Sequence, residues 1–153
     1  MKRIAITLLL GAALPALADR VPLPANAPAA YQAECGACHM AYQPALLPAN
    51  DWRRTIAALN DHFGTDATVD GPAGQEIARF LERNAGNAGK LGSAGEPPRI
   101  SQTARFVRKH RDIPAKYWKD PRIKSAANCE ACHRGAADGN YGEHDILIRE
   151  LRR

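Results

Sequence analysis

Two five-residue stretches decide the fold of this 153-residue chain: Cys35-Gly36-Ala37-Cys38-His39 and Cys129-Glu130-Ala131-Cys132-His133. Both have the pattern C-x-x-C-H, the attachment signature of a c-type haem. Two thiols about one helical turn apart can each add to a vinyl group of one porphyrin, and the imidazole that follows can bind the iron beneath the ring. The sequence therefore predicts two covalent haems, held by Cys35, Cys38, Cys129 and Cys132, with His39 and His133 as the proximal iron ligands.

Other uses of paired cysteines suit this sequence less well. Two disulfides in an exported protein do not require a histidine directly after each pair. A zinc ribbon places its C-x-x-C pairs about 15–20 residues apart, whereas most of the chain separates the pairs here. A thioredoxin-like redox motif expects a strand–helix–strand context, and neither site has a strand pattern around it.

Residues 1–18 have the pattern of a secretory signal peptide. Lys2 and Arg3 form its positive region, an apolar run follows, and Ala16-Leu17-Ala18 fits a cleavage site. The run is too short to span a bilayer and Pro15 interrupts it, and no later stretch is apolar enough to cross one. We expect cleavage before Asp19, export to the periplasm, and a soluble mature protein with no membrane span.

The charge of the chain is modest. Loss of Lys2 and Arg3 lowers the formal charge from +5 to +3. This small surplus of positive charge suggests an acidic docking partner, but it is not the charge pattern of a nucleic-acid-binding protein. Aromatic residues make up 6% of the chain, which is low for a protein that must build a core and agrees with a fold that depends on a cofactor.

The second axial ligand of each iron must come from elsewhere in the chain. Methionine is the usual choice in electron-carrying cytochromes c, but Met1 leaves with the signal peptide and Met40 directly follows a proximal histidine. His62 lies at the margin of the apolar face of a predicted helix, and His110 continues the apolar stripe of Phe106. We expect both to bind iron, because histidine is a common haem ligand.

His144 has a different setting. It lies between Glu143 and Asp145 in a glycine-rich tail without apolar periodicity, so we expect it to be solvated. His62 with the first haem and His110 with the second is the simplest pairing. A cross-over, in which each half lends its histidine to the other iron, stays open at this point.

The apolar spacing predicts a small all-α fold. The clearest helix is expected over residues 50–63, and a second over residues 71–83. Further helices are expected over residues 29–40 and 123–134 around the two haem motifs, from Ser101 to His110, and around Trp118. The tail, residues 135–153, is expected to be extended or irregular.

Glycine and proline divide the chain into two halves. Gly86, Gly89, Gly92 and Gly95 recur every third residue, and two prolines follow. We expect residues 86–98 to form a flexible linker or a loop over a haem. Residues 19–85 and 99–153 would then be two haem-binding halves, each a cytochrome-c-like helical unit wrapped around one haem with long loops.

Several stretches resemble the small dihaem cytochrome c family of bacterial periplasms. They are residues 35–42 with Pro44 and residues 46–48, residues 61–64, residues 109–113, and residues 128–129 leading into the second motif. The resemblance covers most of the mature chain. It implies His39 and His133 as proximal ligands, His62 and His110 as distal ligands, and low-potential six-coordinate haems.

The resemblance also implies a function and partners. By resemblance, the chain would donate electrons to a small monohaem cytochrome with an open iron site, or would be a partner of a membrane b-type cytochrome. The small dihaem subunit of periplasmic nitrate reductase shares the two motifs and bis-histidine ligation, and is the alternative within electron transfer.

A haem enzyme or gas-binding protein is the alternative of a different class. It requires one iron with an open sixth position. Because two further histidines are available for the two irons, the sequence predicts an electron carrier and not an enzyme.

Overall fold

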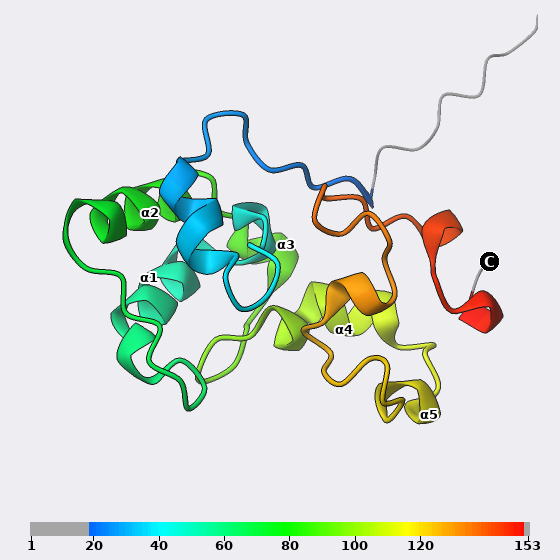
Figure 1. The fold of residues 1–153 in the computed structure, drawn as a ribbon. Coiled ribbons are helices and arrows are strands. Elements are labelled where there is room, and N and C mark those ends of the chain that lie inside the picture. Colours follow the sequence, from blue (N-terminus) through cyan, green and yellow to red (C-terminus); the bar gives the residue numbers. More distant parts are fainter. Residues whose placement is uncertain (1–18, 152–153) are drawn as a thin grey trace, which may run out of the picture.

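The computed structural model describes residues 19–151, so the predicted signal peptide, residues 1–18, lies outside the described residues. Figure 1 shows two lobes: α1, α2 and α3 belong to one, and α4, α5 and the C-terminal loops to the other. Within the described part of the chain every regular element is a helix, and isolated bridges are the other backbone pairings. The expected all-α class is confirmed.

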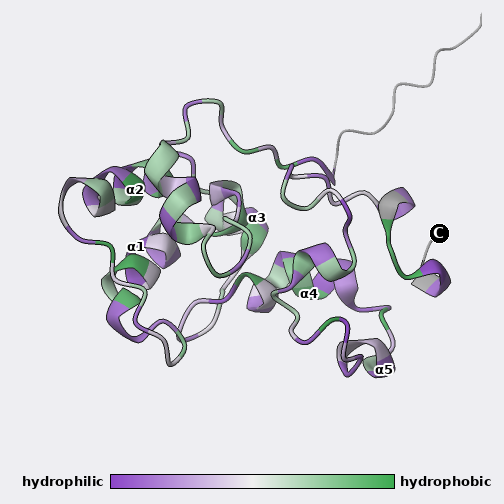
Figure 2. Ribbon diagram, in the orientation of Figure 1, coloured by the Kyte–Doolittle hydropathy of each residue, from purple (hydrophilic) through white to green (hydrophobic). Residues whose placement is uncertain are grey.

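The first lobe is built on helices α1 (Ala49–Ala57) and α2 (Gly71–Arg83). Helix α2 has the predicted bounds, and Ile77, Phe80 and Leu81 are its buried stripe. Figure 2 shows that apolar and polar residues alternate along both helices. The core consists of eight buried residues: Tyr31, Ala41, Leu47, Trp52, Ile77, Phe80, Leu81 and Ala94.

Helix α1 is shorter than the sequence predicted. The expected helix over residues 50–63 ends at Ala57, and a single 3-10 turn, Leu59–Asp61, follows. The Asp61 carboxylate accepts a hydrogen bond from the Gly64 amide (3.0 Å), and Phe63 has a φ of 55°. Aspartate stabilises such turns through its side chain, so this stretch forms a turn and not a further turn of helix.

The helices expected around the two haem motifs are also wrong in extent. The first motif follows a π-helical turn, Tyr31–Cys35, and the second holds only a 3-10 turn, Cys129–Ala131. Lys124 has a φ of 61°, and the Asn128 side chain donates to the Ile123 carbonyl (3.1 Å). These side-chain and left-handed conformations compete with a continuous helix, so each motif lies on a tight turn.

The stretch expected as a linker, residues 86–98, is packed. It contains the short helix α3 (Ala88–Leu91), and Leu91 and Ala94 are buried. The Gly86 amide donates to the Leu47 carbonyl (2.8 Å), and a Cβ on Gly86 would lie 2.3 Å from the Ala45 carbonyl oxygen. Gly86 therefore permits a close backbone approach, and the stretch is part of the folded lobe rather than a free connection.

The second lobe holds helices α4 (Ala104–His110) and α5 (Ala115–Trp118). Helix α4 begins three residues after the predicted start at Ser101, because Thr103 is its cap: the Thr103 hydroxyl accepts from the Phe106 amide (3.1 Å). Ile146 and Ile148 of the tail are buried against Ile123 in a second, smaller core. Two 3-10 turns, Glu143–Asp145 and Arg149–Leu151, flank these residues. The tail is therefore irregular, as the sequence predicted.

Several hydrogen bonds join the lobes. The leader crosses between them in Figure 1, and the Val21 amide donates to the Gly139 carbonyl (2.7 Å). The Tyr42 hydroxyl donates to the Ala127 carbonyl (2.7 Å) from the opposite lobe. From residue 19 to residue 151, no helix has the length and apolar character needed to cross a membrane.

Candidate functional site

The first histidine pair is His39 and His62, whose ring centres lie 6.3 Å apart. His39 comes from the first haem motif, and its Nδ1 lies 2.8 Å from the Met40 carbonyl oxygen. The Tyr42 ring packs against the His39 ring at 4.8 Å. A hydrogen bond at Nδ1 fixes the orientation of an imidazole and leaves Nε2 for a metal.

The turn after α1 brings His62 to this position. The His62 amide donates to the Thr65 carbonyl (2.8 Å), and the next residue, Phe63, adopts the left-handed conformation. The Arg99 guanidinium lies 3.9 Å from the centre of the Phe63 ring. Burial, together with His39 and Arg99, lowers the pKa of His62. A neutral imidazole is the form that binds a metal.

The second histidine pair is His110 and His133, whose ring centres lie 6.1 Å apart with nearly perpendicular planes. His110 ends α4, and its Nδ1 lies 2.8 Å from the Phe106 carbonyl oxygen. The Phe106 ring stacks on the His110 ring at 3.9 Å, and Trp118 of α5 lies 5.9 Å away. Helix α4 and these two aromatic rings therefore fix the imidazole of His110.

His133, the other member of this pair, is half-buried. Its Nδ1 is buried and has no hydrogen-bond partner among the described residues. Burial, followed by the neighbouring His110, lowers the pKa of His133 to about 4. The lowered pKa keeps the imidazole of His133 neutral, which is the form that binds a metal.

The spacing of both pairs matches two imidazoles on one metal. Imidazoles on opposite sides of a metal, each with a bond of about 2.0 Å, have ring centres roughly 6 Å apart. The observed separations are 6.3 Å for His39 and His62 and 6.1 Å for His110 and His133. Each pair lies within one half of the sequence, which is the arrangement that the direct pairing requires.

The cysteines lie beside these pairs as free thiols. Cys129 and Cys132 line a cavity with His110, His133, Ile113 and Trp118, whose walls are mostly apolar, as a porphyrin requires. Cys38 and His39 line a second, more open hollow with Glu130 of the other motif, and His62 is not part of its lining. The cavity at His110 and His133 therefore fits a haem, whereas at the first site the fit rests on the spacing of His39 and His62.

The alternatives for the cysteines lose support. All four are unpaired, so the disulfide alternative is not formed. Burial raises the pKa of Cys35 and of Cys129 to about 11, whereas a redox C-x-x-C motif lowers the pKa of its thiol. Across residues 19–151, no group of three or more Cys, His, Asp or Glu side chains converges as a zinc site would require.

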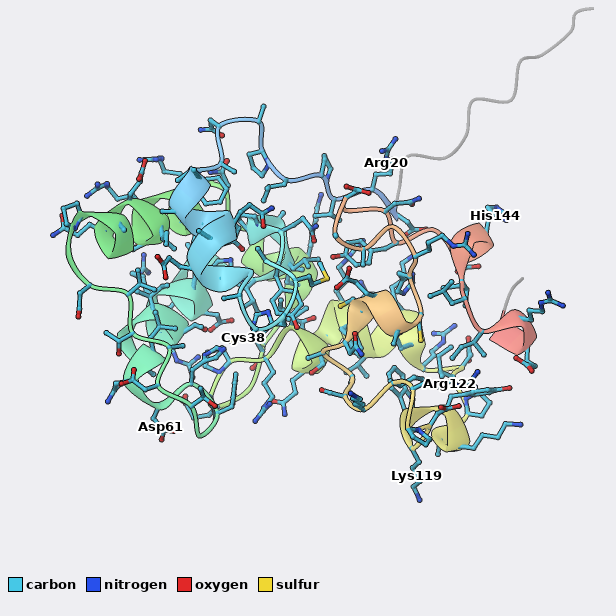
Figure 3. The ribbon with its side chains drawn as sticks, viewed as in Figure 1. Arg20, Cys38, Asp61, Lys119, Arg122 and His144 are labelled. Atoms are coloured by element: carbon cyan, nitrogen blue, oxygen red, sulfur yellow. The ribbon has the colours of Figure 1, made fainter. Side chains whose placement is uncertain are left out.

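His144 lies apart from both pairs. It is exposed on the 3-10 turn Glu143–Asp145, as the sequence predicted (Figure 3).

The sequence did not predict the hydrogen bonds by which the side chain of Gln43 joins the two lobes. Gln43 is fully buried, and its Nε2 donates to the carbonyls of Ala136 (2.9 Å) and Ala137 (3.1 Å) in the other lobe. Its Oε1 accepts from the Tyr141 hydroxyl, and the Tyr141 ring packs edge-on against His133 at 5.5 Å. A glutamine in a loop carries no sequence signal for such a contact. Tyr42 and Tyr141 likewise show no periodicity that would predict their packing on the histidines.

Comparisons with known proteins agree with this site. Residues 31–141 match the family model described as dihaem cytochrome c. A diheme cytochrome c from Shewanella baltica OS155 is 37% identical over 78% of this chain and 91% of its own, with a TM-score of 0.69. A diheme cytochrome c from Rhodobacter sphaeroides is 36% identical over 78% of this chain and 99% of its own, with a TM-score of 0.67. No curated protein matches the chain.

The fold, the two attachment motifs and these similarities lead to one conclusion. The chain belongs to the dihaem cytochrome c family and is an electron-transfer cytochrome with two covalently bound haems c.

Proposed function

We propose that this protein is a periplasmic electron carrier with two low-potential, bis-histidine haems. His39 and His62 hold the first iron, and His133 and His110 hold the second. The observation that carries the proposal is the spacing of the two histidine pairs, 6.3 Å and 6.1 Å, which suits one metal between each pair. Cys35 and Cys38 attach the first porphyrin, and Cys129 and Cys132 attach the second.

The side chains of the protein determine how such a carrier works. A haem supplies a reversible one-electron change at its iron. Imidazoles on both faces leave no open position for a substrate, so the protein acts as a carrier and not as an enzyme. Histidine in place of methionine lowers the reduction potential. The hydrogen bonds at Nδ1 of His39 and His110 keep both rings oriented whichever redox state is present.

The partners we propose are redox proteins. A small monohaem cytochrome with an open iron site would accept electrons, and a membrane b-type cytochrome would supply them. The signal pattern of residues 1–18 supports the periplasm as the compartment of this exchange. The formal charge of +3 for the mature chain suits acidic partners rather than cationic ones.

Electron paramagnetic resonance of single variants tests the ligands. We expect His62→Ala and His110→Ala each to convert one low-spin ferric haem into a high-spin haem, because each change removes one axial imidazole. The reduced forms of these two variants should also bind carbon monoxide. His144→Ala is the matched control: its imidazole is exposed and makes no ring contact with either pair, so both low-spin signals should persist.

The wild-type spectrum provides the decisive comparison. A high-spin haem in the wild-type protein, or rapid carbon monoxide binding to its reduced form, would show an open iron and contradict the carrier function. Fewer than two thioether-linked haems by mass spectrometry would contradict the attachment sites.

A further inference from the structure

Charge is distributed unevenly along this chain. Residues 104–124 contain eight Lys and Arg against two Asp, whereas residues 19–98 contain nine Asp and Glu against six Lys and Arg. These counts give formal charges of +6 and −3. The modest net charge therefore conceals a separation: the basic residues gather on the second lobe, and the first lobe is weakly acidic.

The basic residues cover α4, α5 and the turn after them, and we call this surface the basic face. Its members are Arg105, Arg108, Lys109, Arg111, Lys116, Lys119, Arg122 and Lys124. Figure 3 shows Lys119 and Arg122 at the end of the second lobe, far from Asp61 of the first. The Trp118 ring lies 6.2 Å from that of Phe106, so α5 packs on α4 and the two helices share this surface.

Few of these cations are neutralised within the protein. Lys109 pairs with Asp19 (2.8 Å), Arg122 with Asp120 (2.6 Å) and Arg111 with Asp112 (3.7 Å). Among residues 19–151, the other five make no ion pair, and Arg108, Lys116, Lys119 and Lys124 are exposed. Exposed cations at this density attract an acidic surface.

The basic face borders the second haem site. Arg105 and Lys109 line the same cavity as His110 and His133, together with the acidic residues Asp19, Asp112 and Glu143, and His110 itself ends α4. Val107, at the middle of α4, is 56% exposed, and it is followed in the chain by Arg108 and, one helical turn later, by Arg111. An apolar residue within a charged rim is the usual anatomy of a protein–protein interface.

We propose that the basic face is the docking surface for an acidic redox partner, and that it brings this partner to the edge of the second haem. The inference rests on the proposed electron-carrier function. It also gives the two haems different roles, because the first haem belongs to the acidic lobe. In the exchange one electron leaves the reduced haem, which becomes ferric, and enters the partner, which is reduced by one electron.

A protein partner suits this surface better than a membrane. Helices α4 and α5 span seven and four residues, too short for an amphipathic helix that lies in a lipid interface. Polybasic segments bind the anionic cytoplasmic leaflet, whereas this chain carries an export signal. The apolar centre beside the haem cavity indicates a partner that must approach the cofactor closely.

Binding of the fully haem-loaded protein to a carboxymethyl surface tests the charge of the face. The double variant Arg108→Glu with Lys119→Glu reverses two of its exposed, unpaired cations. The matched control, Arg79→Glu with Arg83→Glu, makes the same change in net charge on the exposed face of α2. At about 0.1 M ionic strength the Debye length is about 10 Å, so we expect the first double variant to lose retention and the control to stay close to wild type. Equal losses would show that net charge alone decides binding, and would overturn the proposal.

Oxidation of the reduced protein by hexacyanoferrate(III) is the kinetic readout. We expect the face variant to react about tenfold more slowly than the α2 control, with the difference vanishing at high salt.

Equal rates in the two variants would overturn the docking face and leave the carrier function intact. Failure of either haem to be oxidised in the wild type would overturn the carrier function itself. The protein could instead bind phosphatidylglycerol vesicles, lose this binding in the face variant, and not be retained on carboxymethyl groups. That result would identify a lipid surface as the partner and overturn the proposal of a protein partner.

Discussion

Gln43 shows at the scale of a single residue how the two lobes hold together. Its side chain is completely buried and makes three hydrogen bonds to the other lobe, to Ala136, Ala137 and Tyr141. A buried amide is costly unless its donors and acceptor are all satisfied. Because Tyr141 packs on His133 and the preceding Tyr42 packs on His39, this amide also links the surroundings of the two proximal histidines.

Replacing Gln43 by Leu should destabilise the protein by about 2–4 kcal/mol, since two carbonyls and one hydroxyl lose their buried partner. Denaturant unfolding followed by circular dichroism measures the change. Gln75→Leu, at an exposed position of α2, is the control and should alter stability by less than about 0.5 kcal/mol. A Gln43→Leu variant as stable as the control would mean that these hydrogen bonds contribute nothing.

Helix α4 is the element that combines His110, which we propose as an iron ligand, with the basic face. It has only seven residues, and short helices are marginal without capping and tertiary packing. Thr103 caps its start, while Arg108, Lys109 and His110 occupy its last turn. Cations at a helix C-terminus interact favourably with the macrodipole, so the sequence of α4 stabilises the helix locally as well as supplying His110.

We expect Thr103→Ala to cost about 1–2 kcal/mol, because the Phe106 amide loses its capping oxygen. Thr103 is also 2% exposed, so the lost methyl group must be separated from the lost cap. Thr103→Ser keeps the hydroxyl and removes only the methyl. If thermal unfolding shows Ser to be as destabilising as Ala, packing and not capping explains the effect.

At the scale of the molecule, the two lobes have separate cores of unequal size. The first core has eight buried residues around Phe80, whereas the second has three, Ile123, Ile146 and Ile148. Cys35 packs against the first core and Cys132 against the second. Each thioether site is therefore anchored in its own core, and the hydrogen bonds of Tyr42 and Gln43 join the two.

The larger core should contribute most to global stability. Phe80 is 1% exposed and its ring centre lies 5.1 Å from that of Tyr31, so Phe80→Ala should lower the free energy of unfolding by about 3–5 kcal/mol. Val107→Ala, at a side chain that is 56% exposed, should change it by less than about 0.5 kcal/mol. Guanidinium titrations of both variants provide the comparison, and similar midpoints would contradict a central role for this core.

The sequence by itself determined what depends on local chemistry. The C-x-x-C-H spacing identified both haem attachments, because adjacent thiols and an imidazole must act on one porphyrin. Apolar periodicity located α2, because its buried stripe repeats with the turn of the helix. Apolar periodicity gave the wrong end for the helix predicted over residues 50–63, which ends at Ala57. The side chain of Asp61 stabilises a turn there, and this turn brings His62 beside His39.

Only the tertiary structure decided which histidines lie next to each other and which residues join the two lobes. His110 and His133 are separated by more than twenty positions in the chain, and the fold of the second lobe brings their ring centres within 6.1 Å. Gln43 likewise acquires its role from carbonyls more than ninety positions away. Such contacts depend on how distant segments pack, and neither local propensity nor spacing along the chain encodes that packing.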